Sequence, residues 1–374
     1  MKVKLEDVCE ILDNKRIPVA ATERKEGIYP YYGANGLQGT IDNYIFDDEL
    51  VLLAEDGGNF GSKVRPIAYR VSGKCWVNNH AHVLKPKSNI NVDYLCYSLM
   101  FYDVSSLVNG ATRKKLTQTD MRKMTVQLLP MDEQMHIVSC LNKLSNLHSL
   151  RHQQLEKLDL LVKSRFVEMF GDPILNNKQW KIDSLVNVTN KIGSGATPKG
   201  GKESYQAEGI SLIRSLNVHD GGFEYDDLAH ITDAQAKELD NVKIEKNDVF
   251  INITGASVAR SCIVPDTVLP ARVNQHVSIV RCKPDVVNYI FINQMFLNTS
   301  YKKHLLAMGE AGGATRQAIT KQQLEKLVII VPPLELQNQF ATFVHQVDKS
   351  KFVIKQSIEK LELLKNKLMQ DYFG

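Results

Sequence analysis

The sequence lacks the features that define several protein classes. Its six cysteines are scattered, with no Cys-x-x-Cys pair, which argues against a zinc site and a disulfide framework and fits a reducing compartment. No apolar run approaches the ~18–20 residues of a membrane span, and the first residues carry no apolar core like that of a signal peptide. Neither sign of charge dominates, since the formal net charge is only +4. We therefore expect a cytoplasmic globular protein with no membrane association, whose weak basic excess permits nucleic-acid binding without demanding it.

Motifs of catalysis are also missing from the sequence. There is no HExxH, no GxSxG, no protein-kinase set and no Asn-Pro-Pro-aromatic or Asp-Pro-Pro-aromatic run. The stretch nearest to a Walker A motif, at 195–203, has Glu203 where Ser or Thr is needed, and Gly193-Ser194-Gly195 lacks the third glycine of a dinucleotide fingerprint. The ten histidines are dispersed. We predict no catalytic residue, no metal site and no cofactor in this chain.

What the chain does contain is a long internal repeat. A Gly-Ala-Thr-Arg run at 110–113 recurs at 313–316, and a Phe-Gly pair at 170–171 recurs at 373–374, both at a spacing of 203 residues. Solenoid units recur every ~20–50 residues, so this is a duplicated module rather than a solenoid. Each copy is a globular part followed by a helix. Two copies of one binding module suggest a target with two halves.

The clearest predicted elements are two long helices. Residues 131–170 and 334–373 contain neither Pro nor Gly, and each could span about 60 Å at ~1.5 Å per residue. Apolar residues follow a seven-residue period, which is typical of a coiled coil. The predicted seam consists of Ile137, Leu141, Leu144, Leu155, Leu158 and Val162 in the first helix and Phe340, Val347, Ile354, Leu361 and Leu368 in the second. Polar residues interrupt it at His148, Arg151 and Lys351, where they can fix the register.

We predict an α+β chain with two similar globular domains separated by two long helices that pair as an antiparallel coiled coil. The predicted segments are domain 1 at 1–130, a central spacer helix at 131–171, domain 2 at 172–333 and a distal C-terminal helix at 334–374. The alternative is that each helix packs separately on its own domain. Within the domains, Thr117 and Thr320 are predicted to cap short helices, the second with Gln323 in a capping box.

Loops that occur in both halves carry candidate nucleic-acid contacts. A basic cluster just before a helix start attracts phosphate, and Asn and Arg can bind adenine and guanine edges. The candidates are Arg113, Lys114 and Lys115 with Arg316 and Lys321 in the matching loop; Asn59, Ser62 and Lys63 with Thr254, Ser257 and Arg260 in the loops that follow strands; and Arg214 and Tyr32. The competing interpretation is that these are solvated turns or structural loops, with Tyr32 packed inside the domain. The Val-Asn-Asn-His and Val-Asn-Gln-His runs at 77–80 and 273–276 recur so closely that they indicate scaffold rather than sequence reading.

This layout resembles the specificity subunit of a type I restriction-modification system. Supporting stretches are Tyr-Tyr-Gly-Ala-Asn-Gly at 31–36, the Gly-Ala-Thr-Arg loops, and a Pro-x-x-x-Gln pattern that ends at Gln134 and again at Gln337. Residues 192–198 and 212–215 also look like the opening of such a domain. The likeness covers essentially the whole chain, and the duplicated arrangement is more specific than any single motif.

The resemblance implies a non-catalytic DNA-binding subunit. In that family each globular part is a target-recognition domain that reads one half of a split double-stranded DNA site. The helices separate the domains and dock two modification subunits, which carry the methyltransferase chemistry and its S-adenosylmethionine, and restriction subunits join them. Two other functions compete with this one: a helical-rod adaptor whose end domains bind protein, and a stand-alone enzyme acting on nucleic acid, which the missing motifs disfavour.

Overall fold

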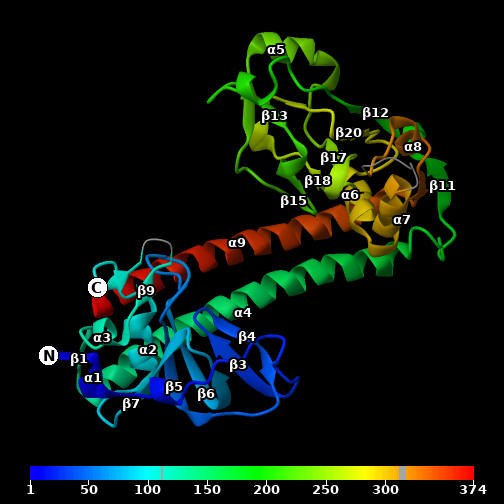
Figure 1. The fold of residues 1–374 in the computed structure, drawn as a ribbon. Coiled ribbons are helices and arrows are strands. Elements are labelled where there is room, and N and C mark those ends of the chain that lie inside the picture. Colours follow the sequence, from blue (N-terminus) through cyan, green and yellow to red (C-terminus); the bar gives the residue numbers. More distant parts are fainter. Residues whose placement is uncertain (111–112, 311–316) are drawn as a thin grey trace. The chain divides into compact units, whose positions relative to one another are not determined.

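A computed structural model of the chain describes residues 1–110, 113–310 and 317–374. The chain forms two compact units, one made of residues 1–152 with 356–374 and the other of residues 153–355 (Figure 1). The two long helices, α4 (Met131–Phe170) and α9 (Leu334–Phe373), each contribute to both units. Among the described residues, no helix is long and apolar enough to cross a membrane.

The first unit is built on a six-stranded sheet with the order β2-β7-β5-β6-β3-β4. All neighbouring strands are antiparallel except β3 and β6, which are parallel. The strands of this unit are β1 (Lys2–Lys4), β2 (Cys9–Ile11), β3 (Tyr29–Gly33), β4 (Gly36–Ile41), β5 (Phe46–Ala54), β6 (Ala68–Val77), β7 (Ala81–Pro86), β8 (Val108–Asn109), β9 (Lys115–Leu116) and β10 (Thr125–Gln127). Its helices besides α4 and α9 are α1 (Leu5–Val8), α2 (Val92–Met100), α3 (Gln118–Met121) and the 3-10 turn Asp13–Lys15.

The second unit has smaller sheets. A four-stranded sheet with the order β12-β20-β17-β18 and a three-stranded sheet with the order β16-β13-β19 form its centre. The strands are β11 (Lys181–Ser184), β12 (Thr189–Ser194), β13 (Ile210–Ile213), β14 (Val218–His219), β15 (Gly222–Phe223), β16 (Ala229–Ile231), β17 (Val249–Asn252), β18 (Ser261–Ile263), β19 (Ala271–Val273), β20 (Val277–Cys282) and β21 (Val328–Val331). The helices are α5 (Asp233–Glu238), α6 (Tyr289–Leu297), α7 (Thr299–Glu310) and α8 (Lys321–Glu325).

Short side-chain caps begin several of these helices. Thr117 accepts a hydrogen bond from the Asp120 N–H at the start of α3, and Thr320 forms a capping box with Gln323 at the start of α8. These two predictions are confirmed. Such caps satisfy backbone N–H groups that the first turn of a helix leaves without partners.

The long helices pack against each other in antiparallel directions within each unit. In the second unit, Phe166 of α4 contacts Phe340 of α9, with ring centroids 5.6 Å apart, and Asp159 forms an ion pair with Lys351. In the first unit, His148 Nε2 lies 3.0 Å from Glu362 Oε1. Partner numbers rise along one helix as they fall along the other, so the antiparallel prediction is confirmed. Of the three polar interruptions, His148 and Lys351 therefore have partners on the facing helix.

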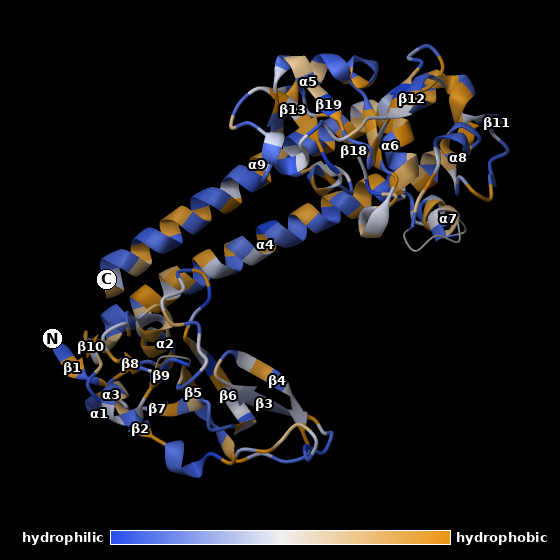
Figure 2. Ribbon diagram, turned by 45° about the horizontal axis from the view of Figure 1, so that its top comes forward, coloured by the Kyte–Doolittle hydropathy of each residue, from blue (hydrophilic) through white to orange (hydrophobic). Residues whose placement is uncertain are grey.

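The seam positions are shielded while their neighbours on the same helices are exposed, and hydrophobic and hydrophilic residues alternate along both ribbons (Figure 2). Ile137, Leu141, Val162, Phe340 and Val347 are buried. The half-buried seam residues are Leu144, Leu155, Leu158, Ile354, Leu361 and Leu368.

The end of α9 packs on the core of the first unit. Leu368, Met369, Tyr372 and Phe373 contact its buried cluster, and the Phe373 ring lies 5.3 Å from that of Tyr94. The distal helix therefore does not stay on its own domain, contrary to the alternative of separate packing. The predicted domain boundaries, which treat each long helix as its own segment, remain a prediction.

Candidate nucleic-acid interface

Three segments of the first unit meet where β5 ends. The loop that follows β5 joins the turn at 78–80 through a hydrogen bond from Glu55 N to His80 O of 2.9 Å. It joins the segment that follows the first Gly-Ala-Thr-Arg run through a bond from Leu116 N to Glu55 O of 2.7 Å. Backbone hydrogen bonds thus join three segments that are distant in sequence.

The second unit repeats this pair of backbone hydrogen bonds, which we call the loop frame. Ile253 N donates to His276 O at 2.9 Å, and Ile319 N donates to Ile253 O at 2.8 Å. These contacts place Ile253 at the position of Glu55, and His276 at the position of His80. The duplication therefore extends to the tertiary contacts that assemble the loops.

The recurrent Asn-x-His turns hold this frame together. Asn78 Oδ1 accepts from His80 N at 2.8 Å, and Asn274 Oδ1 accepts from His276 N at 3.0 Å. Both asparagines are 5 % exposed. A buried amide that caps its own turn is a structural group, which supports the interpretation of these runs as scaffold.

In the first unit, carboxylates neutralise two of the predicted basic contacts. Arg113 Nη2 lies 2.7 Å from Asp56 Oδ1, and Lys115 Nζ lies 3.0 Å from Glu55 Oε1. Lys114 is exposed and has no side-chain partner among the described residues. Sequence reasoning missed both acidic partners, because they precede the cluster by nearly 60 residues.

The loop that follows β5 contains the other candidates of this domain. Ser62 Oγ accepts from the backbone N–H groups of Val64 and Arg65, at 3.2 and 2.8 Å, so Ser62 shapes the turn. Lys63 is exposed, and the half-buried Asn59 has no side-chain partner among the described residues.

The second unit places its candidates differently. Thr254 Oγ1 lies 2.5 Å from His276 Nδ1, and Lys321 Nζ lies 3.5 Å from Glu325 Oε1. Ser257 and Arg260 lie in the loop that follows β17, where Arg260 N donates to Ser257 O at 3.2 Å. Arg214 follows β13 and packs over the Tyr205 ring, with 5.4 Å from Cζ to the ring centroid. The candidate Arg316 lies outside the described residues, as do 111–112 and 311–315.

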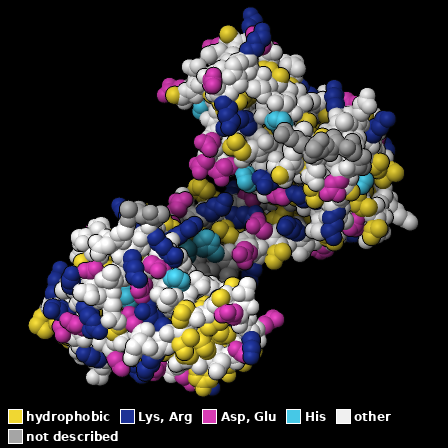
Figure 3. Space-filling model, viewed as in Figure 1, with side chains coloured by type: hydrophobic (Ala, Val, Ile, Leu, Met, Phe, Trp, Pro, Cys, Tyr) yellow, Lys and Arg dark blue, Asp and Glu magenta, His cyan; other side chains and the backbone are white. Residues whose placement is uncertain are grey.

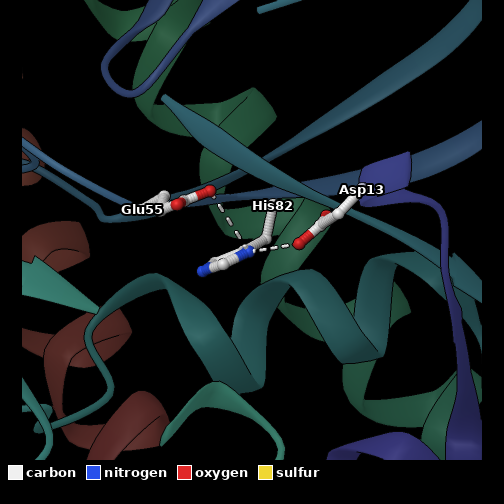
Figure 4. A group of neighbouring side chains, drawn as sticks. All are labelled: Asp13, Glu55 and His82. Carbon is white, nitrogen blue, oxygen red and sulfur yellow. Dashed lines mark hydrogen bonds and ion pairs between the residues drawn. The ribbon is translucent and has the colours of Figure 1, made fainter. Parts of the chain in front are cut away.

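A buried charge network supports the loop of the first unit. The His82 ring lies between the Asp13 and Glu55 carboxylates (Figure 4), with Nδ1 2.6 Å from Asp13 Oδ2 and 3.7 Å from Glu55 Oε2. His82 Nε2 lies 2.9 Å from Leu116 O. Arg16 binds both carboxylates, with Nη1 2.5 Å from Glu55 and Nη2 3.5 Å from Asp13. Asp13, Glu55 and His82 are close enough to one another to bind a metal ion, but the Arg16 guanidinium already supplies a positive charge between the two carboxylates.

The electrostatics of this network favour charged carboxylates. Burial alone would raise the pKa of Asp13, but hydrogen bonds from His82 and the Val83 N–H outweigh it and hold that pKa below its ordinary value. Burial would likewise raise the pKa of Glu55, but hydrogen bonds from Arg16 and Lys115 more than offset this effect, so that pKa is also lowered. The first domain thus holds the charged Asp13 and Glu55 carboxylates, paired with Arg16, beneath the loop that follows β5.

In the described part of the second domain, the positions that match Glu55, Lys115 and His82 do not form such a network. Ile253 takes the place of Glu55, and Ala318, which forms a β-bridge with Thr254, takes the place of Lys115, which forms a β-bridge with Asp56. Ser278 lies two residues after His276, as His82 lies two residues after His80. The same frame therefore holds different side chains in the two domains.

The comparisons with known proteins agree with this duplicated arrangement. The family model described as type I restriction modification DNA specificity domain matches residues 1–160 and 177–363. The chain belongs to this family. The resemblance noted from the repeat is confirmed, and the role of the chain is DNA sequence specificity within a type I restriction-modification system. The alternative of a helical-rod adaptor is not favoured.

Relatives of known description span most of the chain. A protein from Haemophilus influenzae, described as a type I restriction enzyme specificity subunit, is 26% identical over 349 residues, which cover 92% of this chain and 86% of the relative. A protein from Methanocaldococcus jannaschii, described as the specificity subunit of type I restriction enzyme MjaX, is 23% identical over 307 residues, 77% of this chain and 68% of the relative.

Solved structures share the fold. The crystal structure of a type I restriction-modification system S subunit from M. genitalium matches with a TM-score of 0.60 at 13% identity, covering 100% of this chain and 96% of that one. A chain from a structural study of the assembly of the type I system matches with a TM-score of 0.58 at 16% identity, covering 100% and 97%. At these identities the likeness concerns the fold alone.

Proposed function

We propose that each globular domain of this chain reads one half of a bipartite double-stranded DNA site. The observation that carries the proposal is the loop frame that recurs in both domains with the same backbone hydrogen bonds and different side chains. A constant frame presents loops to the duplex in the same way, while different side chains select different bases. The basic side chains Lys63, Lys114 and Lys321 are proposed to contact phosphate, which positions each domain without reading sequence.

We also propose that the long helices dock two modification subunits. Both helices expose large apolar residues on faces away from the seam, among them Leu150 and Leu160 of α4 and Phe352 and Leu363 of α9, which are 53%, 60%, 62% and 70% exposed. Large apolar side chains left exposed along both helices support a protein contact there. The modification subunits are proposed to carry S-adenosylmethionine and the methyltransferase chemistry, restriction subunits to join the complex, and this chain to contribute no catalytic group.

A map of DNA methylation at base resolution, in host cells with and without this chain, tests the proposal. We expect one split motif to lose its methylation on deletion while the modification subunit, followed by immunoblot, stays present. That motif would give both half-sites and their spacing. Survival of every methylated motif would refute the proposed role in directing methylation.

A further inference from the structure

Each domain has an equivalent sheet edge with the same backbone pairing, but the side chains at that edge differ between the domains. In the first domain, β3 runs parallel to β6 with Tyr32 beside Val77, and Asn78 N donates to Tyr32 O at 3.0 Å. In the second, β13 runs parallel to β19 with Ile213 beside Val273, and Asn274 N donates to Ile213 O at 3.0 Å. Tyr32 therefore matches Ile213, and the next residues, Gly33 and Arg214, also match. This edge combines a constant backbone with variable side chains.

In the first domain, this edge borders a hollow of about 520 Å³. Its floor and walls come from the end of β3, the start of β4, the loop that follows β5 and the start of β6. Among its lining side chains are Tyr32, Asn35, Leu37, Asn59, Arg65 and Tyr69. Asn35 Nδ2 donates to Gly57 O at 2.9 Å and so ties the β3–β4 turn to the loop that follows β5. Tyr69 donates its hydroxyl to Gly33 O.

Two polar groups in this hollow have no partner within residues 1–110, 113–310 and 317–374. The Asn59 amide and the Arg65 guanidinium make no hydrogen bond, ion pair or ring contact with any described residue. Their backbone is nonetheless held in place, since Ser62 Oγ accepts from Arg65 N at 2.8 Å and Ser62 N donates to Asn59 O at 3.0 Å. The loop backbone is therefore fixed, and the Asn59 amide and the exposed Arg65 guanidinium stay available to a ligand.

The chemistry of the hollow matches base edges. An Asn amide binds adenine N6 and N7 in a bidentate manner, an Arg guanidinium binds guanine O6 and N7, and apolar groups contact the thymine methyl. Leu37 of the lining and Val64 of the loop that follows β5 are exposed, and hydrophobic side chains gather over β3, β4 and β6 on the face drawn in Figure 3. The exposed Lys63 in the same loop adds a group for the flanking phosphate.

We propose that this hollow is the base-reading site of the first domain, where Asn59 takes an adenine edge and Arg65 a guanine edge of one DNA half-site. The inference deepens the proposed function and rests on it. Asn59 is already a candidate from the sequence, whereas Arg65 is a residue that the internal repeat could not identify. The second domain presents Arg214 at the matching edge, held against Tyr205, and would read a different half-site from there.

The test uses the full chain assembled with its modification subunits and a plasmid library in which both half-sites are randomised. Methylation is then read at each position. The variants Asn59→Ala and Arg65→Ala are each expected to reduce discrimination at one position of one half-site by roughly 5- to 150-fold, the range of one bidentate base contact. The other half-site should keep its sequence. Asn59→Asp and Arg65→Lys repeat the test with side chains of similar size. Lys keeps the positive charge of Arg but lacks its planar fork.

Two further variants separate base reading from simple charge effects. Lys25→Ala removes one positive charge from an exposed site of the same domain outside the hollow and should leave the position preferences unchanged. Lys63→Ala should weaken binding about equally across sequences, as loss of a phosphate contact does. Gel-shift titration of the complex on its best duplex and on single-base variants gives a second readout that does not depend on methyl transfer.

The outcomes distinguish this inference from the proposed function. Unchanged position preferences in both alanine variants, or a uniform loss across all sequences, would overturn base reading by Asn59 and Arg65. A wild-type complex with no bipartite preference would instead refute the proposed function itself.

Discussion

The buried network of the first domain predicts that Asp13→Asn strongly destabilises this domain and leaves the second one intact. The buried Asp13 accepts hydrogen bonds through its carboxylate from Val83 N at 2.8 Å, His82 Nδ1 at 2.6 Å and Gln118 Nε2 at 3.0 Å. An asparagine offers one acceptor oxygen instead of two. Its NH₂ group would then face either the backbone N–H or the other donors, so at least one buried donor loses its partner.

The expected magnitude follows from burial. The side chains of His82 and Asp13 are 0% and 3% exposed, and that of Arg16 is 13% exposed, so solvent screens them little. Breaking a buried ion pair from one side costs about 3–5 kcal/mol. Because a typical domain is stable by only ~5–15 kcal/mol, a loss of about 3 kcal/mol should be easily measured.

The dependence on pH has a definite sign. The folded-state pKa values of Asp13 and Glu55 both lie below their ordinary values. A carboxyl of this kind stabilises the fold above its unfolded pKa, ~3.9 for Asp and ~4.3 for Glu, and this contribution is lost as pH falls through the folded pKa. The wild-type domain should therefore lose stability below about pH 4, and the difference between wild type and Asp13→Asn should shrink there.

Hydrogen exchange followed by mass spectrometry on the full chain in its complex measures each domain separately. Peptides from β5 and β7 report on the first domain, and peptides from β17 and β20 provide an internal control. Asp42→Asn, at an exposed site, is the matched control variant. Equal protection of wild type and Asp13→Asn at pH 7, or a difference that grows toward acid, would refute the reasoning.

Three further predictions concern the helices. Gln337→Leu removes the buried acceptor of Asn288 N (2.9 Å) and the donor to Pro332 O (2.8 Å), at ~1–3 kcal/mol per orphaned group, and should lower exchange protection at the starts of α6 and α9. Phe170→Ala, whose ring lies 4.8 Å from Phe291 and 5.4 Å from Phe340, should cost about 3–5 kcal/mol in denaturant unfolding; an effect below ~1 kcal/mol would contradict that packing. If the paired helices set the distance between the half-sites, one heptad inserted into both α4 and α9 adds about 10 Å and should lengthen the gap by roughly three base pairs of ~3.4 Å; an unaltered gap in the methylation map would exclude this spacing role.

The long helices and their pairing were predictable because their signals are local or periodic. The breaks before residue 131 and after 170 come from Pro130 and Gly171, and the structure places α4 at Met131–Phe170. The heptad period identifies the face that packs, and the polar interruptions at His148 and Lys351 have partners on the opposite helix. Both the residues that end the helices and the heptad period can be identified from short stretches of the sequence.

The charge network and the hollow were not predictable, because they depend on contacts between distant segments. Asp13 meets His82, and Glu55 meets Lys115, only after β5 and β7 have paired. Nothing near Arg113 in the sequence indicates that Asp56 neutralises it. The repeat could not identify Arg65, because it emphasises residues that recur, whereas a base-reading residue is expected to differ between the halves.

Comparison of the two domains separates contacts that build the frame from contacts that select sequence. Gln134 and Gln337 each accept from a backbone N–H before a helix, Asn91 N at 2.8 Å and Asn288 N at 2.9 Å, and so recur as frame. Glu55 and Ile253 occupy the same backbone position, although one side chain is acidic and the other is apolar. Because the frame depends on backbone hydrogen bonds and a few buried amides, the side chains above it can change without altering the fold. One duplicated architecture can therefore read two different half-sites within a single chain.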